Sequence, residues 1–147
     1  MLNIQQEAPL INTFGIPAVA SVLVVSDDIA ELADYVRMNI KNIKPLILGG
    51  GSNVLFVSER CELVIRPNIR GIEIIDETND YAALRVGAGE VWDDFVGWCV
   101  KHNYSGLENL SHIPGTVGAC PIQNIGAYGV EAKETIYAVE TIEMATG

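Results

Sequence analysis

Three consecutive glycines directly after a short apolar run constrain this chain more than any other feature. Residues 45–48 read Pro-Leu-Ile-Leu, which is too short for a helix and typical of a buried strand, and Gly49, Gly50 and Gly51 follow without a spacer. Because three adjacent glycines are costly in backbone entropy, a plain mobile turn explains them poorly. We therefore expect an ordered loop at the end of a strand.

The residues around this loop predict alternating strands and a helix. The apolar segments typical of strands are residues 20–25, 45–48, 54–57 and 62–66. Between the first two of them, apolar residues recur at helical spacing up to Ile40, with Ser26 as the expected N-cap. Residues 1–17 are expected to form an irregular arm, since two prolines and a glycine interrupt any period. The first half therefore predicts a strand–helix–strand unit.

The second half predicts an antiparallel element and one more helix. Residues 71–75 and 81–86 flank a turn and are typical of a hairpin, and residues 90–102 follow as a helix with an aromatic face. Residues 135–144 again resemble a strand, with a turn at 146–147 and no return strand. We expect an α+β chain that stops within its architecture.

Composition and net charge limit the size of the fold, the kinds of binding partner and the cellular location that we expect. With 49% hydrophobic residues, 147 residues suffice to bury the core of one domain or of two small lobes. The net charge of −10 has the wrong sign for nucleic acid, so no such partner is expected. The apolar stretch at residues 18–25 is far shorter than the roughly 20 residues of a membrane span. No membrane partner is therefore expected, and a cytoplasmic location is expected because three cysteines without a CxxC pair fit a reducing compartment.

The cysteines and histidines carry weak signals. Three cysteines without a CxxC pair indicate neither a disulfide framework nor a structural zinc site. Cys99 and His102 have C-x-x-H spacing but no second pair, so no metal site is expected there. Cys120 lacks an identifiable partner base, which makes a catalytic thiol a minor alternative.

The glycine loop, residues 49–53, is the first candidate for ligand binding. Consecutive glycines allow backbone N–H groups to converge on an oxyanion, and Ser52 and Asn53 add side-chain donors. No Gly-Lys-Ser/Thr follows, and the spacing and the helix of a dinucleotide-binding Rossmann motif are missing. We favour an anion or cofactor loop over a plain turn.

Residues 105–131 are the second candidate, with five glycines and two prolines and no sustained period. Long ordered loops in compact domains are usually functional. Small residues here would allow the backbone to lie against a planar ligand, with Gln123 and Asn124 as directional hydrogen-bonding groups. A structural crossover packed by its isoleucines and valine explains the segment equally well.

Three segments together resemble one family. They are Asn-Thr-Phe-Gly at 12–15, Leu-Gly-Gly-Gly-Ser-Asn-Val-Leu at 48–55, and the run from 106 through 131. In this order they closely resemble the N-terminal part of the bacterial UDP-N-acetylenolpyruvoylglucosamine reductases, also called UDP-N-acetylmuramate dehydrogenases. The resemblance implies a two-lobed FAD-binding domain of the vanillyl-alcohol-oxidase type, truncated at its C-terminal end. Residues 1–70 would form the first lobe and 71–147 an incomplete second lobe, without the substrate-binding domain.

The resemblance also implies which residues bind the cofactor. The glycine loop would hold the pyrophosphate of FAD, residues of the second candidate segment would line the flavin, and two N-terminal residues would support the same cavity. The residues so implicated are Asn12, Thr13, Gly49, Gly50, Gly51, Ser52, Asn53, Pro114, Gly115, Gly118, Gln123, Asn124 and Gly126.

The family reaction sets the expected function. NADPH reduces FAD, and the flavin reduces UDP-N-acetylglucosamine enolpyruvate to UDP-N-acetylmuramate in peptidoglycan synthesis. The family's catalytic arginine, serine and glutamate have no counterpart in these 147 residues, so we expect an FAD-binding portion that is inactive alone. Two alternatives stay open: a cofactor-free binding or assembly module that associates through an unpaired sheet edge, and another flavin oxidoreductase of the same fold.

Overall fold

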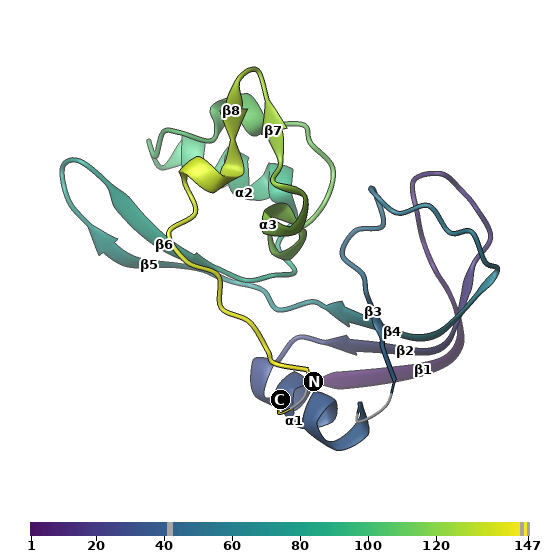
Figure 1. The fold of residues 1–147 in the computed structure, drawn as a ribbon. Coiled ribbons are helices and arrows are strands. Elements are labelled where there is room, and N and C mark those ends of the chain that lie inside the picture. The colour runs from purple at the N-terminus through teal and green to yellow at the C-terminus, as the bar shows by residue number, and fades with distance from the viewer. Residues whose placement is uncertain (41–42, 145, 147) are drawn as a thin grey trace. The chain divides into compact units, whose positions relative to one another are not determined.

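The chain forms two compact units, each built from helices and strands (Figure 1). The computed structural model describes residues 1–40, 43–144 and 146. Unit 1 comprises Met1–Ile69 with Glu140–Gly147, and unit 2 comprises Arg70–Val139. The mixture of helices and strands confirms the α+β class.

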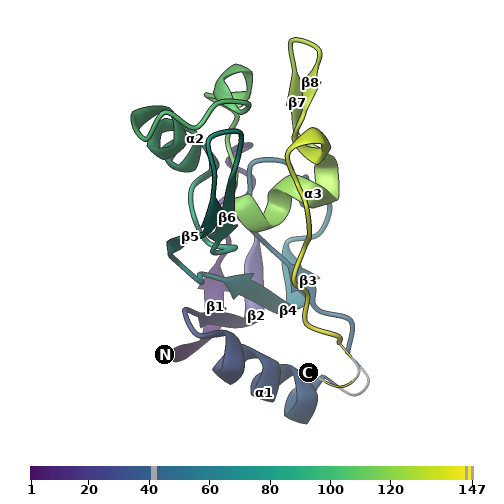
Figure 2. The same ribbon diagram turned by 90° about the vertical axis from the view of Figure 1, so that its left-hand side faces the viewer.

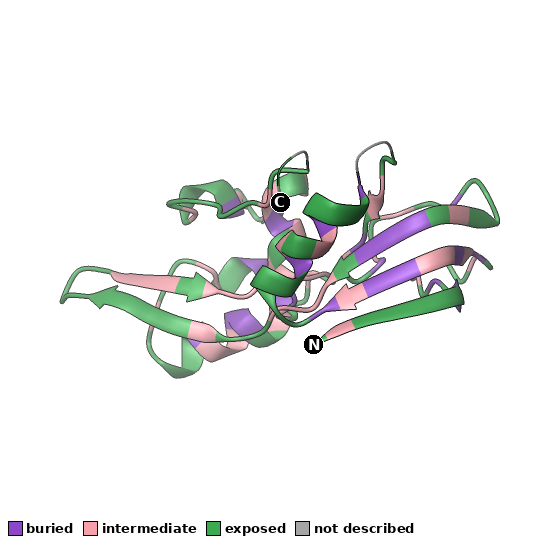
Figure 3. Cartoon of the chain, turned by 90° about the horizontal axis from the view of Figure 1, so that it is seen from below, coloured by how far each residue is buried: buried purple, intermediate pink, exposed green. Residues whose placement is uncertain are grey.

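Unit 1 is built on a four-stranded sheet in its described residues, with the strand order β1-β2-β4-β3. Its strands are β1 (Leu2–Pro9), β2 (Val19–Ser26), β3 (Leu46–Ile47) and β4 (Arg60–Pro67). β2 and β3 run parallel to β4, whereas β1 pairs antiparallel with β2. Figure 3 shows buried residues along the central strands and a mostly exposed β1.

Side-chain alternation along the central strands creates two packed faces. Helix α1 (Ile29–Asn39) covers one face, where Leu32 and Val36 join the cluster of Val24, Leu63 and Ile65. The alternate residues of the same strands point to the opposite face of the sheet. There the cluster of buried residues includes Leu23 and Val64 from the strands and Leu10, Leu48 and Phe56 from loops. Loops therefore take the place of a second helical layer.

The start of α1 corrects the predicted cap. Asp28, not Ser26, is the N-cap, and its carboxylate accepts a hydrogen bond from the N–H of Glu31 at 2.9 Å. Ser26 is the fully buried last residue of β2, paired with Pro67, and its hydroxyl donates to the carbonyl of Asp28 at 2.8 Å. Strand pairing thus moves the cap two residues along the chain.

Three further expectations from the sequence are wrong. The arm predicted at residues 1–17 contains β1, whose backbone pairs with β2 although Ala8 is its one buried residue. Residues 54–57 form no strand, because they belong to the loop that carries Phe56 onto the sheet. Residues 135–144 form no strand either, and the return turn expected at 146–147 lies partly outside the described residues.

The irregular 135–144 segment connects the cores of the two units. Ile136 packs against the core of unit 2, whereas Ile142 packs against the α1 side of unit 1. The apolar residues of this segment therefore pack in two different cores and do not form one face of a strand.

Unit 2 contains two hairpins and a short helical layer (Figure 2). Its elements are β5 (Ile72–Glu77), β6 (Ala82–Val86), α2 (Trp92–Lys101), α3 (Cys120–Gln123), β7 (Gly126–Ala127) and β8 (Val130–Glu131), with 3₁₀ turns at Glu108–Leu110, Val117–Ala119 and Ala132–Glu134. The aromatic face of α2, with Trp92 and Phe95, forms the core together with Leu110 and Ile125. The predicted hairpin and helix are confirmed, and the 105–131 segment resolves into short elements packed on α2.

Across the described ranges, we find no helix with the length and apolar character that a membrane crossing requires.

Candidate functional site

The glycine loop follows β3 and docks on the N-terminal loop, residues 10–17. Both loops lie on the side of the sheet opposite α1 (Figure 1). Gly51 is buried with a φ of +71°, and a Cβ there would lie 2.4 Å from the carbonyl oxygen of Ile11. A side chain at this position would meet both a left-handed backbone and another backbone segment. Gly51 is thus needed for the approach of two loops.

Thr13 joins the two loops through both of its donors. Its backbone N–H donates to the carbonyl of Gly51 and its hydroxyl donates to the carbonyl of Ser52, each at 3.2 Å. The structure therefore brings Thr13 together with Gly51 and Ser52, three of the predicted site residues, from positions far apart in the sequence.

Asn12 closes the N-terminal loop on itself. Its side-chain amide donates to the carbonyls of Ile16 at 2.8 Å and of Leu10 at 3.3 Å, and its Oδ1 accepts from the N–H of Ile16 at 3.1 Å. These bonds direct the side chain of Asn12 to its own loop. Its predicted contact with the cofactor stays a prediction.

The start of the glycine loop is suited to an anion. In the part of the chain that the structure describes, no atom accepts a hydrogen bond from the N–H of Gly49 or Gly50, and Gly50 is exposed. Such donors require water or a ligand as a partner. A loop with adjacent N–H donors and no bulky side chains is suited to bind an anion.

The 113–118 segment of unit 2 docks on the residues that lead into α2. The carbonyl of Gly115 accepts from the N–H of Trp92 at 3.1 Å, and the N–H groups of Val117 and Gly118 donate to the carbonyls of Glu90 and Ala88, each at 2.9 Å. These three bonds hold Gly115 and Gly118 against the entrance of the helix.

Gly118 allows this segment to approach closely. A Cβ at Gly118 would lie 2.7 Å from the Cβ of Ala88 and 2.9 Å from its carbonyl oxygen. The sequence did not single out Ala88, because a backbone contact leaves no pattern of side chains. The glycine itself was the only signal in the sequence.

Asp93, in the first turn of α2, holds the start of the same segment. Its Oδ1 accepts from the N–H of His112 at 2.6 Å and from the hydroxyl of Ser111 at 2.7 Å. The backbone bond from His112, followed by the bond from Ser111, holds the pKa of the Asp93 carboxyl below its ordinary value. The sequence pattern alone gives no sign of this contact between the start of α2 and residues 111–112.

The last predicted residues shape the β7–β8 hairpin. Asn124 ends α3 with a φ of 44°, and its Oδ1 accepts from the N–H of Lys133 at 3.2 Å. The pKa of Glu131 is lowered mainly by its ion pair with Lys133, and the neighbouring side chain of Asn124 lowers it further. A Cβ at Gly126 would lie 3.3 Å from the Cγ of Glu131.

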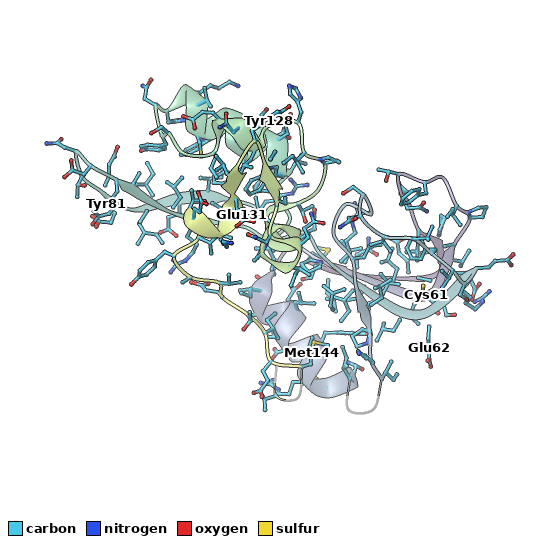
Figure 4. The ribbon with its side chains drawn as sticks, turned by 45° about the horizontal axis from the view of Figure 1, so that its top comes forward. Cys61, Glu62, Tyr81, Tyr128, Glu131 and Met144 are labelled. Carbon is cyan, nitrogen blue, oxygen red and sulfur yellow. The ribbon has the colours of Figure 1, made fainter. Side chains whose placement is uncertain are left out.

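Figure 4 shows Glu131 on β8 and Tyr128 at the turn between the two strands. The side chain of Tyr128 is 90% exposed. Of the two remaining predicted residues, Pro114 is exposed and Gln123 is half-buried at the end of α3. The predicted residues of unit 2 therefore share one short segment around α3.

The cysteine thiols of unit 2 are held in their protonated form. Burial raises the pKa of Cys99 and of Cys120 to about 11, so neither is a thiolate nucleophile near neutral pH. The ring of His102 stacks on Trp98 at 3.9 Å and does not pair with Cys99. Among residues 1–40, 43–144 and 146, we find no cluster of three acidic, histidine or cysteine side chains that could hold a metal ion.

Comparison with known proteins shows the family of this chain. The family described as "FAD binding domain" matches residues 20–147. The chain is 44% identical to a UDP-N-acetylenolpyruvoylglucosamine reductase of Amoebophilus asiaticus, over 99% of this chain and 44% of that protein. It is 46% identical to the protein of the same name in Flavobacterium johnsoniae, over 92% of this chain and 40% of that protein. The chain therefore spans less than half the length of these relatives.

Proposed function

Because the chain belongs to the family of FAD binding domains, with FAD as its cofactor, we propose that it forms the FAD-binding part of a UDP-N-acetylenolpyruvoylglucosamine reductase. The names of the relatives support this assignment, and their identity of 44–46% to the chain extends over nearly its whole length. The observation that carries the proposal is the glycine loop docked on the N-terminal loop. Within the described residues, the N–H groups of Gly49 and Gly50 in this loop have no hydrogen-bond acceptor. The proposal includes a role in cytoplasmic peptidoglycan synthesis.

In this proposal, the two units are the two lobes of a domain of the vanillyl-alcohol-oxidase type. Unit 1 holds the pyrophosphate at residues 49–53. Unit 2 presents the segment from Pro114 to Gly126 to the flavin, with Gln123 and Asn124 as its polar groups. Support comes from Gly51 of unit 1 and Gly118 of unit 2, since a Cβ at either position would overlap a neighbouring segment of the chain.

When bound, FAD supplies hydride transfer from NADPH to the enolpyruvyl group of the UDP-sugar. The residues of this chain bind and orient the cofactor. We assign no catalytic thiolate to them, because burial keeps the Cys99 and Cys120 thiols in their protonated form. The chain is thus proposed as the cofactor-binding part of the reaction.

A titration with FAD tests the proposal. Trp92 and Trp98 both lie in unit 2, so quenching of their emission reports cofactor at that unit. The variant Asn53→Asp adds one negative charge to the glycine loop without changing side-chain size. We expect at least about a fivefold loss of affinity, since two like charges about 4 Å apart repel by about 1 kcal/mol even in water.

The matched control is Asn79→Asp, which adds the same charge to the exposed turn between β5 and β6. It should bind FAD as the wild type does. Equal weakening by both variants would indicate a general charge effect, and a folded wild-type chain that does not bind FAD would refute the proposed function.

A further inference from the structure

We propose that Thr13 is a positioning residue for the cofactor's pyrophosphate: it holds two carbonyl groups of the glycine loop and so directs the N–H groups of Ser52 and Asn53 toward the phosphate oxygens. The inference rests on the proposed function and adds a residue that acts through the loop rather than on the ligand.

The two hydrogen bonds of Thr13 define the arrangement. Its N–H bonds the carbonyl of Gly51 and its hydroxyl bonds the carbonyl of Ser52, each at 3.2 Å. Two successive carbonyls of the glycine loop therefore face the same residue of the N-terminal loop.

The geometry of the peptide bond determines where the N–H groups of Ser52 and Asn53 point when both carbonyls bond Thr13. A trans peptide is planar, and its N–H points opposite to its C=O. The carbonyl of Gly51 shares a peptide with the N–H of Ser52, and the carbonyl of Ser52 shares one with the N–H of Asn53. With both carbonyls on Thr13, both N–H groups face away from it. Successive N–H groups on one side form a concave site for an anion.

The N-terminal loop is rigid enough to impose this direction. Asn12 closes the loop through three hydrogen bonds to Leu10 and Ile16. Gly51 lies so close to the carbonyl of Ile11 that a Cβ would lie 2.4 Å from it. Thr13 therefore bonds the glycine loop from a fixed position. Its hydroxyl donates to a carbonyl of the loop, which is why we assign it to positioning.

The variants Thr13→Val and Thr13→Ser separate the side-chain bond from the backbone bond. Valine keeps the shape and the backbone N–H but removes the hydroxyl, whereas serine restores the hydroxyl. The control Thr135→Val removes a hydroxyl that donates to the carbonyl of Ala132 at 2.9 Å in unit 2, outside the proposed site. Thermal unfolding followed by circular dichroism identifies any variant that fails to fold.

Two measurements follow on the full 147-residue chain. The first is the amide ¹H–¹⁵N spectrum without FAD, where Thr13→Val should shift the resonances of Ser52 and Asn53. The second is FAD titration, where Thr13→Val should weaken binding about three- to tenfold, as expected for one lost hydrogen bond. Thr13→Ser should restore both quantities, and Thr135→Val should change neither.

The outcomes distinguish this inference from the proposed function. If the wild type binds FAD and Thr13→Val binds equally well, positioning by Thr13 is refuted and FAD binding stands. If Thr13→Val weakens binding but leaves both amide resonances in place without FAD, Thr13 contacts the ligand directly and the inference is overturned. If the folded wild type does not bind FAD, the proposed function itself fails.

Discussion

The glycine loop of unit 1 and the 113–118 segment of unit 2 are held in place by different backbone groups. In unit 1, the carbonyls of Gly51 and Ser52 accept hydrogen bonds from Thr13. In unit 2, the carbonyl of Gly115 accepts from the N–H of Trp92, but the N–H groups of Val117 and Gly118 are themselves used, as donors to carbonyls near the start of α2. A loop held by its carbonyls directs its N–H donors elsewhere, whereas a loop held by its N–H groups has already used those donors.

This difference separates two roles for glycine-rich segments. The glycine loop is suited to bind an anion, because its donors face away from the protein segment that holds it. The 113–118 segment is suited to form a close-packed surface, because Gly118 lies against Ala88 with no room for a side chain. Glycine content by itself therefore does not identify an anion site.

The largest effect is expected from Gly51→Ala. Its positive φ costs about 1–2 kcal/mol for a residue with a Cβ, and the overlap with the carbonyl of Ile11 adds about 1–3 kcal/mol. We expect the free energy of unfolding to fall by about 2–5 kcal/mol in urea denaturation followed by circular dichroism.

Gly15→Ala is the matched control in the N-terminal loop. Gly15 has a φ of +66°, and a Cβ there would have no neighbour within 4 Å. In Gly15→Ala, the free energy of unfolding should fall only by the cost of the positive φ, about 1–2 kcal/mol. Equal losses at the two positions would show that the docking of the two loops does not depend on Gly51.

A smaller effect is expected from Gly118→Ala. The overlap with Ala88 should lower the free energy of unfolding by about 1–3 kcal/mol. Urea denaturation followed by tryptophan emission reports unit 2 specifically, since Trp92 and Trp98 both lie there. The control Gly97→Ala, inside α2 with open space at the Cβ, should instead stabilise the protein by about 0.5–1 kcal/mol. Comparable destabilisation by both variants would contradict the packing role of Gly118.

The smallest effect concerns the pH dependence at Asp93. Hydrogen bonds from His112 and Ser111 lower its pKa below the ordinary 3.8 in the folded state. The unfolded state therefore binds the proton more tightly, so the contribution of Asp93 is present above pH 3.8 and is lost as the pH falls through the lowered pKa.

Asp93→Asn should therefore cost stability at pH about 6 and much less at pH about 2, measured by urea denaturation with tryptophan emission. The control is Asp94→Asn, a change of the same charge at the exposed neighbouring residue. A loss at Asp93→Asn that is the same at both pH values would refute the role of the carboxylate in holding residues 111–112.

The sequence predicted the elements whose side chains carry a strong period. The strand at residues 20–25, the hairpin around residues 72–86 and the helix at residues 90–102 all correspond to observed elements. It missed β1, whose strand is defined by pairing with β2 rather than by burial. It also misread residues 135–144, whose apolar side chains anchor in two different cores.

The sequence alone determined where the glycines lie and that three ordered segments resemble a flavin-binding family. Only the tertiary structure decided what each glycine contacts: Gly51 meets Ile11, and Gly118 meets Ala88. It also decided that both donors of Thr13 bond carbonyls of the glycine loop. The physical reason is that side-chain periodicity is local and readable, whereas contacts between distant backbone segments leave no pattern of side chains in the sequence.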